Sequence, residues 1–388
     1  MADTVYISDT VTQVVTMTVE MPSDKLLQER YFPTGENDIF DSKKLLIDYD
    51  NGDRKSGAFL KEGYANGDTT TYFAQTVVPP RVACSDGIDT VNNDKDRLMF
   101  ERFSKMQGNI RPTRADAMNA ILRLKAVRCA DRNARAIERM CVLPLKDGAV
   151  SFTYATSPTD ATAQTVNVLY YDPVKYPDGN PYKIVAEVAW GETGATPYKD
   201  VCKAAQLLKQ HGGRTEDLLM SPDAWDELRK DMQTLGILNN QIYFTMIAND
   251  RDDRDRHFPE IEDYIEVIGT CIFDGIKLRI LVYNGAYEDD KGADQLYLGE
   301  MFACVLAPNC GRTLCGAISK VNPKAVVDLN VDAVACLTGK YVATRFVDIE
   351  NDNVTVRVES VPLCIPNRVW SWVNIEQPEG DGEGGDGE

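Results

Sequence analysis

The stretch Asp217–Leu228, DLLMSPDAWDEL, joins a strand directly to a helix. Its first four residues, Asp217–Met220, predict a short strand. Ser221 then stands at the N-cap position of a helix, and Pro222 occupies the first helical position, where its missing N–H costs no hydrogen bond. The segment therefore indicates a domain that contains both strands and helices.

Residues on both sides of this stretch support the same interpretation. An earlier helix begins at Thr196-Pro197 and is ended by Gly212-Gly213. After the stretch, strands are expected at 266–273 and 276–283, joined by the turn Asp274-Gly275. The order helix, strand, helix and paired strands indicates a mixed α+β domain.

A long helix is expected from Thr113 to Cys141. Thr113 and Asp116 have the spacing of a capping box, and no glycine or proline follows until Pro144. About 28 residues correspond to roughly 40 Å at about 1.5 Å per residue. Residues 111–139 include eight basic and three acidic side chains. This excess favours a solvated face with local salt bridges; the alternative is a contact surface for an acidic neighbour.

Several segments have patterns that cannot bury a core of their own. Residues 1–22 indicate an extended arm, which a small apolar knot follows at 26–32. Residues 41–86 contain strand-like stretches broken by glycine and proline, which predicts a long two-stranded excursion that would be marginal if isolated. Residues 378–388 are only Gly, Pro, Asp and Glu, so disorder is expected. Neighbouring molecules are therefore expected to complete the chain.

Composition restricts the classes of function. The 388 residues suggest two or three domain-sized units, and 43% hydrophobic residues are ample for real cores. A formal net charge of −18 argues against nucleic-acid binding over the whole surface, because phosphates would be repelled. The N-terminal residues show no secretory-signal pattern, and no apolar run approaches the roughly twenty residues of a membrane span. We therefore expect a soluble chain that is intracellular at synthesis and has no membrane partner.

The residue types that most often carry chemistry form no catalytic pattern. Ten cysteines spread from Cys84 to Cys364 without a CxxC favour reduced thiols over a disulfide or zinc framework. His211 is expected at a helix C-terminus, and His257 lies in an Asp- and Arg-rich run that favours a solvated loop over a calcium site. There is no GxSxG, P-loop or HExxH, and the GxGxxG at Gly380–Gly385 lies in the acidic tail. We expect no enzyme activity, no cofactor and no metal.

Several motifs together resemble the major capsid proteins of tailed phages. The stretch at 217–228 and IGTCIFDGIKLRILVYNG at 268–285 resemble the central domain of these proteins. Tyr31-Phe32-Pro33 and the closing VESVPL at 358–363 resemble the lambda-type branch, the major capsid protein E family. The resemblance spans roughly residues 25–375. The central-domain motif falls on Ser221, Pro222, Trp225, Tyr283 and Gly285.

The resemblance implies the α+β fold of the Hong Kong-97 phage capsid protein. That fold has an N-terminal arm, an extended β-hairpin loop, a peripheral domain with a long spine helix, and an axial domain. The expected ranges are 1–40 for the arm, 41–86 for the extended loop, 87–190 with 345–376 for the peripheral domain, 113–141 for its spine helix, 191–344 for the axial domain, and 377–388 for a disordered acidic tail.

The function that the resemblance implies is structural. Copies of the chain would self-assemble as hexamers and pentamers into the icosahedral head of a tailed bacteriophage, enclosing double-stranded DNA without sequence-specific binding. The expected location is the virion, after assembly in the host bacterial cytoplasm, with portal, separate scaffolding and decoration proteins as partners. The extended loop would contact an adjacent subunit through five side chains, Phe59, Leu60, Tyr64, Tyr72 and Phe73.

Two alternatives differ in what the protein does. An encapsulin-like nanocompartment shell would share the fold but enclose an enzyme, so a co-purifying cargo enzyme would favour it. An acidic cysteine-dependent hydrolase belongs to a different class. It has no base placed for any cysteine, and loss of an activity on thiol alkylation would be its sign.

Overall fold

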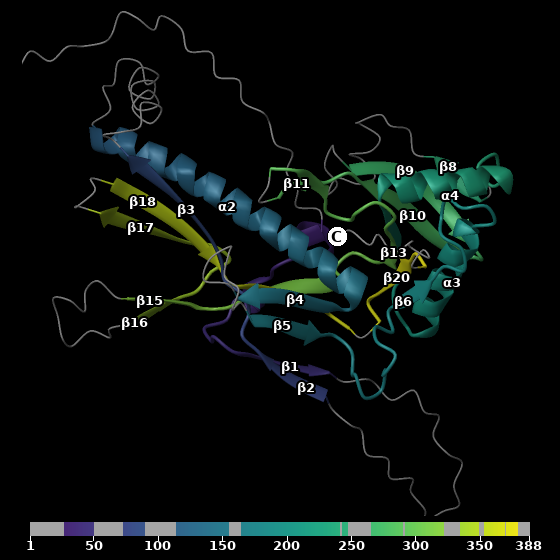
Figure 1. The fold of residues 1–388 in the computed structure, drawn as a ribbon, viewed down its shortest axis with the longest axis horizontal. Helices are drawn as coiled ribbons and strands as arrows, with labels where there is room; N and C mark the ends of the chain where they lie inside the picture. The colour runs from purple at the N-terminus through teal and green to yellow at the C-terminus, as the bar shows by residue number, and fades with distance from the viewer. Residues whose placement is uncertain are drawn as a thin grey trace, which may run out of the picture.

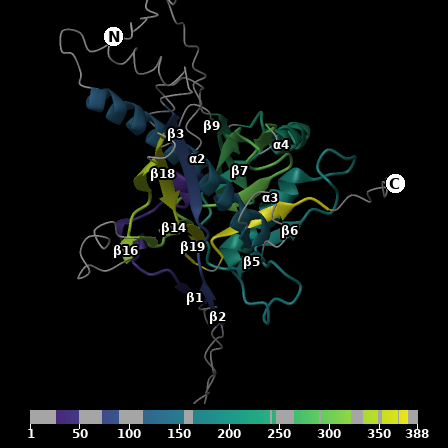
Figure 2. The ribbon, with the colours of Figure 1, turned by 60° about the vertical axis from the view of Figure 1, so that its left-hand side comes forward.

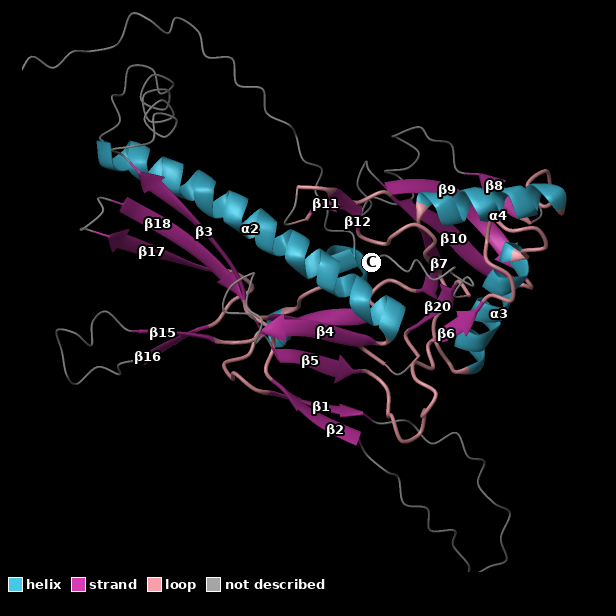
Figure 3. Cartoon of the chain, in the orientation of Figure 1, coloured by secondary structure: helices cyan, strands magenta, loops and turns pink. Residues whose placement is uncertain are grey.

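A long helix and a seven-stranded sheet organise the computed structural model (Figure 1). The structure describes residues 27–49, 73–89, 114–154, 164–240, 243–246, 265–289, 292–321, 334–348, 353–368 and 370–378. The helical elements are η1 (Leu27–Tyr31), η2 (Glu36–Asp38), α2 (Arg114–Asp147), α3 (Pro197–Gln210) and α4 (Pro222–Thr234). The strands are β1 (Leu45–Tyr49), β2 (Phe73–Val77), β3 (Val82–Asp89), β4 (Ala149–Tyr154), β5 (Gln164–Leu169), β6 (Lys183–Val185), β7 (Asp217–Met220), β8 (Phe244–Met246), β9 (Ile265–Phe273), β10 (Ile276–Tyr283), β11 (Ala286–Glu288), β12 (Asp294–Leu296), β13 (Ala303–Leu306), β14 (Gly311–Cys315), β15 (Ile318–Val321), β16 (Val334–Leu337), β17 (Val342–Asp348), β18 (Asn353–Ser360), β19 (Pro362–Pro366) and β20 (Trp372–Glu376). This mixture of strands and helices confirms the α+β class predicted from the sequence (Figure 3).

Helix α2 extends further than the sequence predicts. It ends at Asp147, six residues beyond the expected end at Cys141. Pro144 lies in its last turn, where the missing N–H removes only one hydrogen bond, and the buried side chain of Leu145 keeps that turn packed. Gly148, with a φ of 62°, then ends the helix and donates its N–H to the carbonyl of Pro144 at 3.0 Å.

The N-terminal half of α2 covers a small antiparallel sheet in the order β17-β18-β3. A small hydrophobic cluster joins the helix to this sheet: Ile121, Leu122, Cys129, Val356 and Val358. Asn133 of the helix donates its side-chain amide to the carbonyl of Val358 at 2.9 Å. Lys125 donates to the Asp86 carboxylate at 3.1 Å and to the carbonyl of Gly87 at 2.6 Å. The helix is thus fastened to β3 and β18 by both apolar and polar contacts.

The larger sheet has the order β6-β20-β13-β7-β10-β9-β8. β7 runs parallel to β10, and β20 runs parallel to β6, whereas the other neighbours are antiparallel. All four residues of the central strand β7 are buried, as expected for a strand that is covered on both faces. Helices α3 and α4 lie beside this sheet in both views (Figure 1, Figure 2).

Local sequence signals place the ends of these elements as predicted. β7 occupies Asp217–Met220, and α3 and α4 begin at Pro197 and Pro222. Between β9 and β10, Asp274 and Gly275 both have positive φ, 46° and 80°. Two successive residues with positive φ form the kind of turn that matches the twist of antiparallel strands.

The larger sheet crosses the expected border between the peripheral and axial domains. β6 and β20 fall in the ranges expected for the peripheral domain, yet β20 pairs with both β13 and β6. Similarly, β3 begins at Val82, inside the range expected for the extended loop, and pairs with β18. These partners are far apart in the sequence, and alternation of apolar and polar residues does not reveal which strands pair.

Two-stranded antiparallel pairs complete the described part of the chain: β1-β2, β4-β5, β11-β12, β14-β19 and β15-β16. In β1-β2, Leu45 lies opposite Val77 and Tyr49 lies opposite Phe73. This pair confirms the base of the two-stranded excursion; residues 50–72 lie outside the described residues. Figure 1 shows β1-β2 and β15-β16 at the periphery of the molecule.

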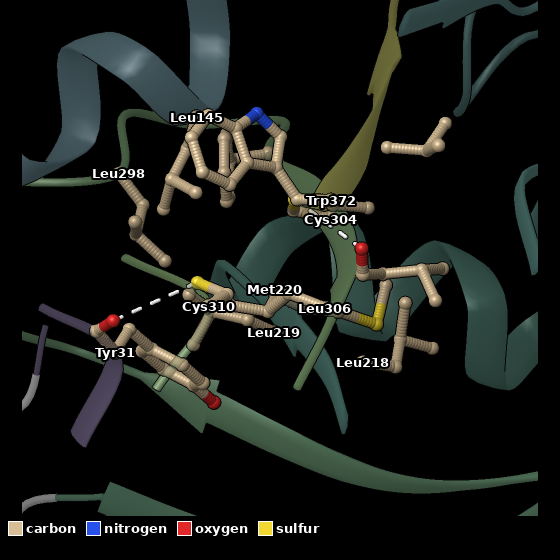
Figure 4. Packing of buried hydrophobic residues seen from close by; sticks show 14 of the residues in the cluster. Tyr31, Leu145, Leu218, Leu219, Met220, Leu298, Cys304, Leu306, Cys310 and Trp372 are labelled. Carbon is tan, nitrogen blue, oxygen red and sulfur yellow. Dashed lines mark hydrogen bonds between the residues drawn. The ribbon is translucent and has the colours of Figure 1, made fainter. Parts of the chain in front are cut away.

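One hydrophobic core joins the larger sheet to the C-terminal half of α2 and to the N-terminal segment. Figure 4 shows Trp372 of β20 in this core together with Leu145 of α2 and Tyr31. The Cys310 thiol lies 3.7 Å from the carbonyl oxygen of Tyr31. Leu27, Tyr31 and Phe32 are each fully buried, which confirms the described part of the apolar knot predicted at 26–32; residue 26 lies outside the described residues.

Candidate functional site: the joint between helix α2 and the larger sheet

The N-terminal segment 27–32 lies between α2 and strands of two sheets. Just after η1, the side chain of Thr313 in β14 donates a hydrogen bond to the backbone carbonyl of Phe32 at 2.8 Å. The side chains of Arg30 and Gln28 are also buried, although both are polar. Buried polar groups need partners, and two carboxylates from distant parts of the chain supply them for the Arg30 guanidinium and for the backbone N–H groups of Leu27 and Gln28.

The first carboxylate belongs to Glu138, which α2 places on its buried side. Its two oxygens accept the backbone N–H groups of Leu27 at 2.7 Å and Gln28 at 2.8 Å. The hydroxyl of Tyr283, at the end of β10, donates to the same side chain at 3.1 Å. One fully buried side chain therefore connects the long helix, the N-terminal segment and the larger sheet.

The second carboxylate belongs to Asp217, the first residue of β7. It accepts hydrogen bonds from Arg30 at 2.9 and 3.1 Å, from the Tyr31 hydroxyl at 3.2 Å and from Arg279 of β10 at 2.6 Å. Burial, and next the Asp217 charge, raise the pKa of Tyr31 well above its usual value, so its hydroxyl stays protonated and able to donate. This charge is buried but fully hydrogen-bonded.

These two carboxylates make a rigid joint rather than a reactive centre. Each is saturated by donors that hold the N-terminal segment in place, and removal of one partner of a buried pair typically costs about 3–5 kcal/mol. The joint escaped the sequence analysis because its members are far apart in the chain. One signal was available: Glu138 shares a helix face with the buried residues Ala134 and Cys141, where an unpaired charge would be costly.

The predicted central-domain motif lies around this joint and in the core beside it. Ser221 caps α4: its buried hydroxyl oxygen accepts the N–H of Ala224 at 3.5 Å and the N–H of Phe302 at 3.1 Å. Pro222 is the first residue of α4, and Trp225 is buried one turn later. These contacts tie the start of α4 to the loop before β13.

Tyr283 and Gly285 of the same motif act together. The Tyr283 ring stacks on the Tyr297 ring, with centroids 6.1 Å apart, and its hydroxyl reaches Glu138. A Cβ atom on Gly285 would collide with the Tyr283 ring, so glycine is required here for packing. All five motif residues thus have structural contacts within the subunit.

Most of the predicted loop contacts fall outside the described residues. This holds for Phe59, Leu60, Tyr64 and Tyr72, whereas Phe73 is the first residue of β2 and pairs with Tyr49. At the base of the same loop, Gln75 donates its amide to the carbonyl of Asn167 in β5 at 3.0 Å. The base of the loop is therefore anchored to the hairpin β4-β5.

A family model described as phage major capsid protein E matches residues 8–376. The chain belongs to the phage major capsid protein E family. This membership confirms the family, the Hong Kong-97-type α+β fold and the capsid function that the sequence predicts. A capsid protein is a component of the virion and associates with further copies of itself.

This capsid protein is also similar to several solved structures. A prophage protein of E. coli CFT073 is 15% identical, with 79% of this chain and 80% of that chain covered and a TM-score of 0.48. The capsid of Ralstonia phage GP4 is 11% identical, with 99% and 100% covered and a TM-score of 0.45. The SrpI encapsulin of Synechococcus elongatus PCC 7942 is 8% identical, with 94% and 91% covered and a TM-score of 0.43. A search of curated proteins finds no match.

The described histidine and cysteines of the capsid protein lie in packing and capping positions. His211 is the C-cap of α3, as predicted, and its ring stacks on Trp370 with centroids 3.7 Å apart; His257 lies outside the described residues. The thiols of Cys141 and Cys364 lie 3.2 Å apart, and burial raises the pKa of Cys141 well above its usual value. The nine cysteines whose side chains the structure describes are free thiols, and no group of His, Cys, Asp and Glu among the described residues could hold a metal ion.

A search of the described helices for membrane spans finds none that is long and apolar enough.

Proposed function

We propose that this capsid protein assembles as hexamers and pentamers into the icosahedral head of a tailed phage and encloses double-stranded DNA without reading its sequence. The observation that carries this proposal is the family match over residues 8–376.

The proposal also assigns the parts of the subunit to domains. The N-terminal arm is 1–40, the extended loop 41–86, the peripheral domain 87–190 with 345–376, the axial domain 191–344, and the acidic tail 377–388. Helix α2 is the spine of the peripheral domain. The strand pairing supports one revision of these borders, because β6 and β20 belong to the sheet of the axial part.

Contacts between subunits follow from this division. The extended loop lies over an adjacent subunit and offers it Phe59, Leu60, Tyr64, Tyr72 and Phe73. Leu46 in β1 supports an apolar contact along the same loop, because 66% of its surface is exposed in the isolated chain. The axial domain, built around β7 and the motif at Ser221, surrounds the axis of each hexamer or pentamer.

The proposal assigns this chain no catalytic role and no cofactor. Its family is one of structural capsid proteins. Burial raises the pKa of Cys304 well above its usual value and that of Cys271 to about 12, so neither thiol is an activated nucleophile. Assembly takes place in the host bacterial cytoplasm, with a portal, a separate scaffolding protein and a decoration protein as partners.

Electron microscopy of the purified protein tests the proposal. The chain is expressed alone and together with the neighbouring genes of its phage, and the products are separated by size-exclusion chromatography. Regular shells, or free hexamers and pentamers, are the expected result. A monodisperse monomer or small oligomer under every condition would contradict the capsid function, and shells with a co-purifying enzyme would favour a nanocompartment.

A further inference from the structure

Four arginines form a row along the solvent side of α2. They are Arg128, Arg132, Arg135 and Arg139, and we call them the arginine stripe. Their spacing of four, three and four residues places them on one helix face, over about 16 Å at about 1.5 Å per residue. Arg128, Arg132 and Arg139 are exposed, and Arg135 is half-buried.

Among the described residues the stripe forms no ion pair, unlike four exposed basic residues near the larger sheet. Elsewhere, Lys203 pairs with Glu187, Arg229 with Asp226, Lys230 with Glu227 and Arg214 with Glu216. None of the four stripe residues forms an ion pair with a described carboxylate. The local salt bridges expected for this helix are therefore absent from the stripe in the described part of the chain. A chain with 60 acidic residues has abundant partners for such pairs.

The neighbours of the stripe hold the guanidinium groups without neutralising them. Arg132 lies 3.8 Å from the Cys84 thiol, and Arg139 lies over the Tyr287 ring, 5.1 Å from its centroid. Two acidic residues share this part of the helix. Asp131 is half-buried, and Glu138 is buried and already bonded to Leu27, Gln28 and Tyr283. The stripe thus retains a net positive charge that is exposed to solvent in the isolated chain.

We propose that the arginine stripe binds the phosphate backbone of the double-stranded DNA that the shell encloses. The inference rests on the proposed function, which supplies this polyanion. The stripe is a regular row of cations, and phosphates follow one another every 3.4 Å of axis along each strand, so about five lie within its length. The guanidinium fork binds phosphate oxygens in pairs, and backbone contacts of this kind are independent of base sequence.

The negative charge of the rest of the chain keeps this contact local. With a formal net charge of −18, most of the surface repels phosphates, and the stripe provides one weak point of attachment per subunit. An acidic segment of a second copy is the competing occupant. It would also match the charge of the stripe, but it would not require a row of four evenly spaced arginines.

Binding of a fluorescein-labelled 24-base-pair duplex to the soluble full chain, followed by anisotropy from low to moderate salt, tests the proposal. If four phosphates are neutralised, the logarithm of the association constant falls with the logarithm of the salt concentration at a slope of about −3.6. Changing all four stripe residues to glutamine should weaken binding at low salt at least about tenfold and flatten this slope. Changing all four to lysine should restore most of the binding, because the positive charges return.

The matched control removes the same number of positive charges from exposed residues near the larger sheet. Lys203, Arg214, Arg229 and Lys230 have side chains that are 50–71% exposed, and all four become glutamine. This control should bind the duplex within about twofold of the original chain. Circular dichroism verifies that each variant is folded.

Three outcomes would overturn the inference. The original chain does not bind the duplex at low salt; the glutamine variant binds as tightly as the original; or the control loses as much affinity as the stripe variant. A stripe variant that binds DNA normally but no longer forms capsomers would identify the stripe as a contact between copies. Shells seen by electron microscopy in any of these cases would show that only this inference has failed, and not the proposed function.

Discussion

The larger sheet and the small sheet under α2 differ in how completely the subunit buries them. In the larger sheet, every residue of β7 and β13 is buried, and the core continues through α3, α4 and the C-terminal half of α2. Beneath the N-terminal half of α2, the buried cluster consists of five residues, and Phe346 of β17 is left 41% exposed. The first region has an extensive core of its own, whereas the second has a small buried cluster and leaves more apolar surface exposed in the subunit.

The joint at Glu138 and Asp217 connects these regions through α2, because Tyr283 of the larger sheet donates to Glu138 of this helix. It fixes the N-terminal segment against α2 through Glu138 and against β7 through Asp217. The following predictions test the contrast between the regions, from the largest expected effect to the smallest.

Replacing Asp217 should cause the largest loss of stability. Asp217→Ala leaves the buried Arg30 guanidinium without its carboxylate and removes a partner of Arg279, at a cost of about 3–5 kcal/mol. The measurement is urea unfolding of the soluble subunit. Asp226→Ala, which removes an exposed pair with Arg229, is the control and should cost less than about 1 kcal/mol. Equal effects of the two changes would contradict the importance of the joint.

Core truncations should distinguish the two regions directly. Leu218→Ala in β7 should cost about 2–5 kcal/mol, because a fully buried side chain leaves a cavity. Val358→Ala in β18 should cost about 1.5–2 kcal/mol, because it removes two buried carbon atoms worth about 0.8 kcal/mol each. Because the joint couples the regions, both variants should shift a single unfolding transition. Two separate transitions would show that the regions unfold independently.

Alkaline pH should lower the stability of the folded chain through the buried thiols of the larger sheet. Burial raises the pKa of Cys271 from 9.0 to about 12. A thiol with a raised pKa in the folded state contributes stability that is fully present below pH 9 and is lost as the pH rises to about 12. Urea midpoints measured between pH 8 and pH 11 should therefore decrease.

Thiol labelling is a second way to compare the burial of the larger sheet with that of the small sheet under α2. At pH 8, iodoacetamide should modify Cys84 of β3, which is half-exposed, before it modifies Cys271 or Cys304 of the larger sheet. Mass spectrometry of the peptides gives the order. The variant Cys84→Ser should lose the fast phase of iodoacetamide labelling and keep the pH dependence of its stability. Fast labelling of Cys304 would contradict the burial of the core around the larger sheet.

The smallest effect on the isolated subunit is expected at the extended loop. Leu46→Ser changes a side chain that is 66% exposed, so the free energy of unfolding should change by less than about 0.5 kcal/mol. Shell formation, measured by electron microscopy and sedimentation, should nevertheless fall. Leu235→Ser, 53% exposed after α4, is the matched control and should assemble normally. Normal shells from Leu46→Ser would remove the support that Leu46 gives to the loop contact.

Local structure was predictable because its signals are local. Ser221-Pro222 and Thr196-Pro197 start helices, and Asp274-Gly275 makes a turn; these predictions are confirmed. The end of α2 was missed because proline in a last turn is tolerated when the following residues are buried, and burial of Leu145 is a tertiary property.

The sequence by itself determined the family, the α+β class and the ends of several elements, because helix caps, turns and motif order depend on residues that are close in the chain. Only the tertiary structure decided which strands pair, that β6 and β20 join the axial sheet, and that Glu138 and Asp217 hold the N-terminal segment. It also decided that Arg128, Arg132, Arg135 and Arg139 form no ion pair with a described carboxylate. The pairing of β6 with β20 and the contacts of Glu138 and Asp217 with the N-terminal segment join residues more than a hundred positions apart, and no local pattern specifies such contacts.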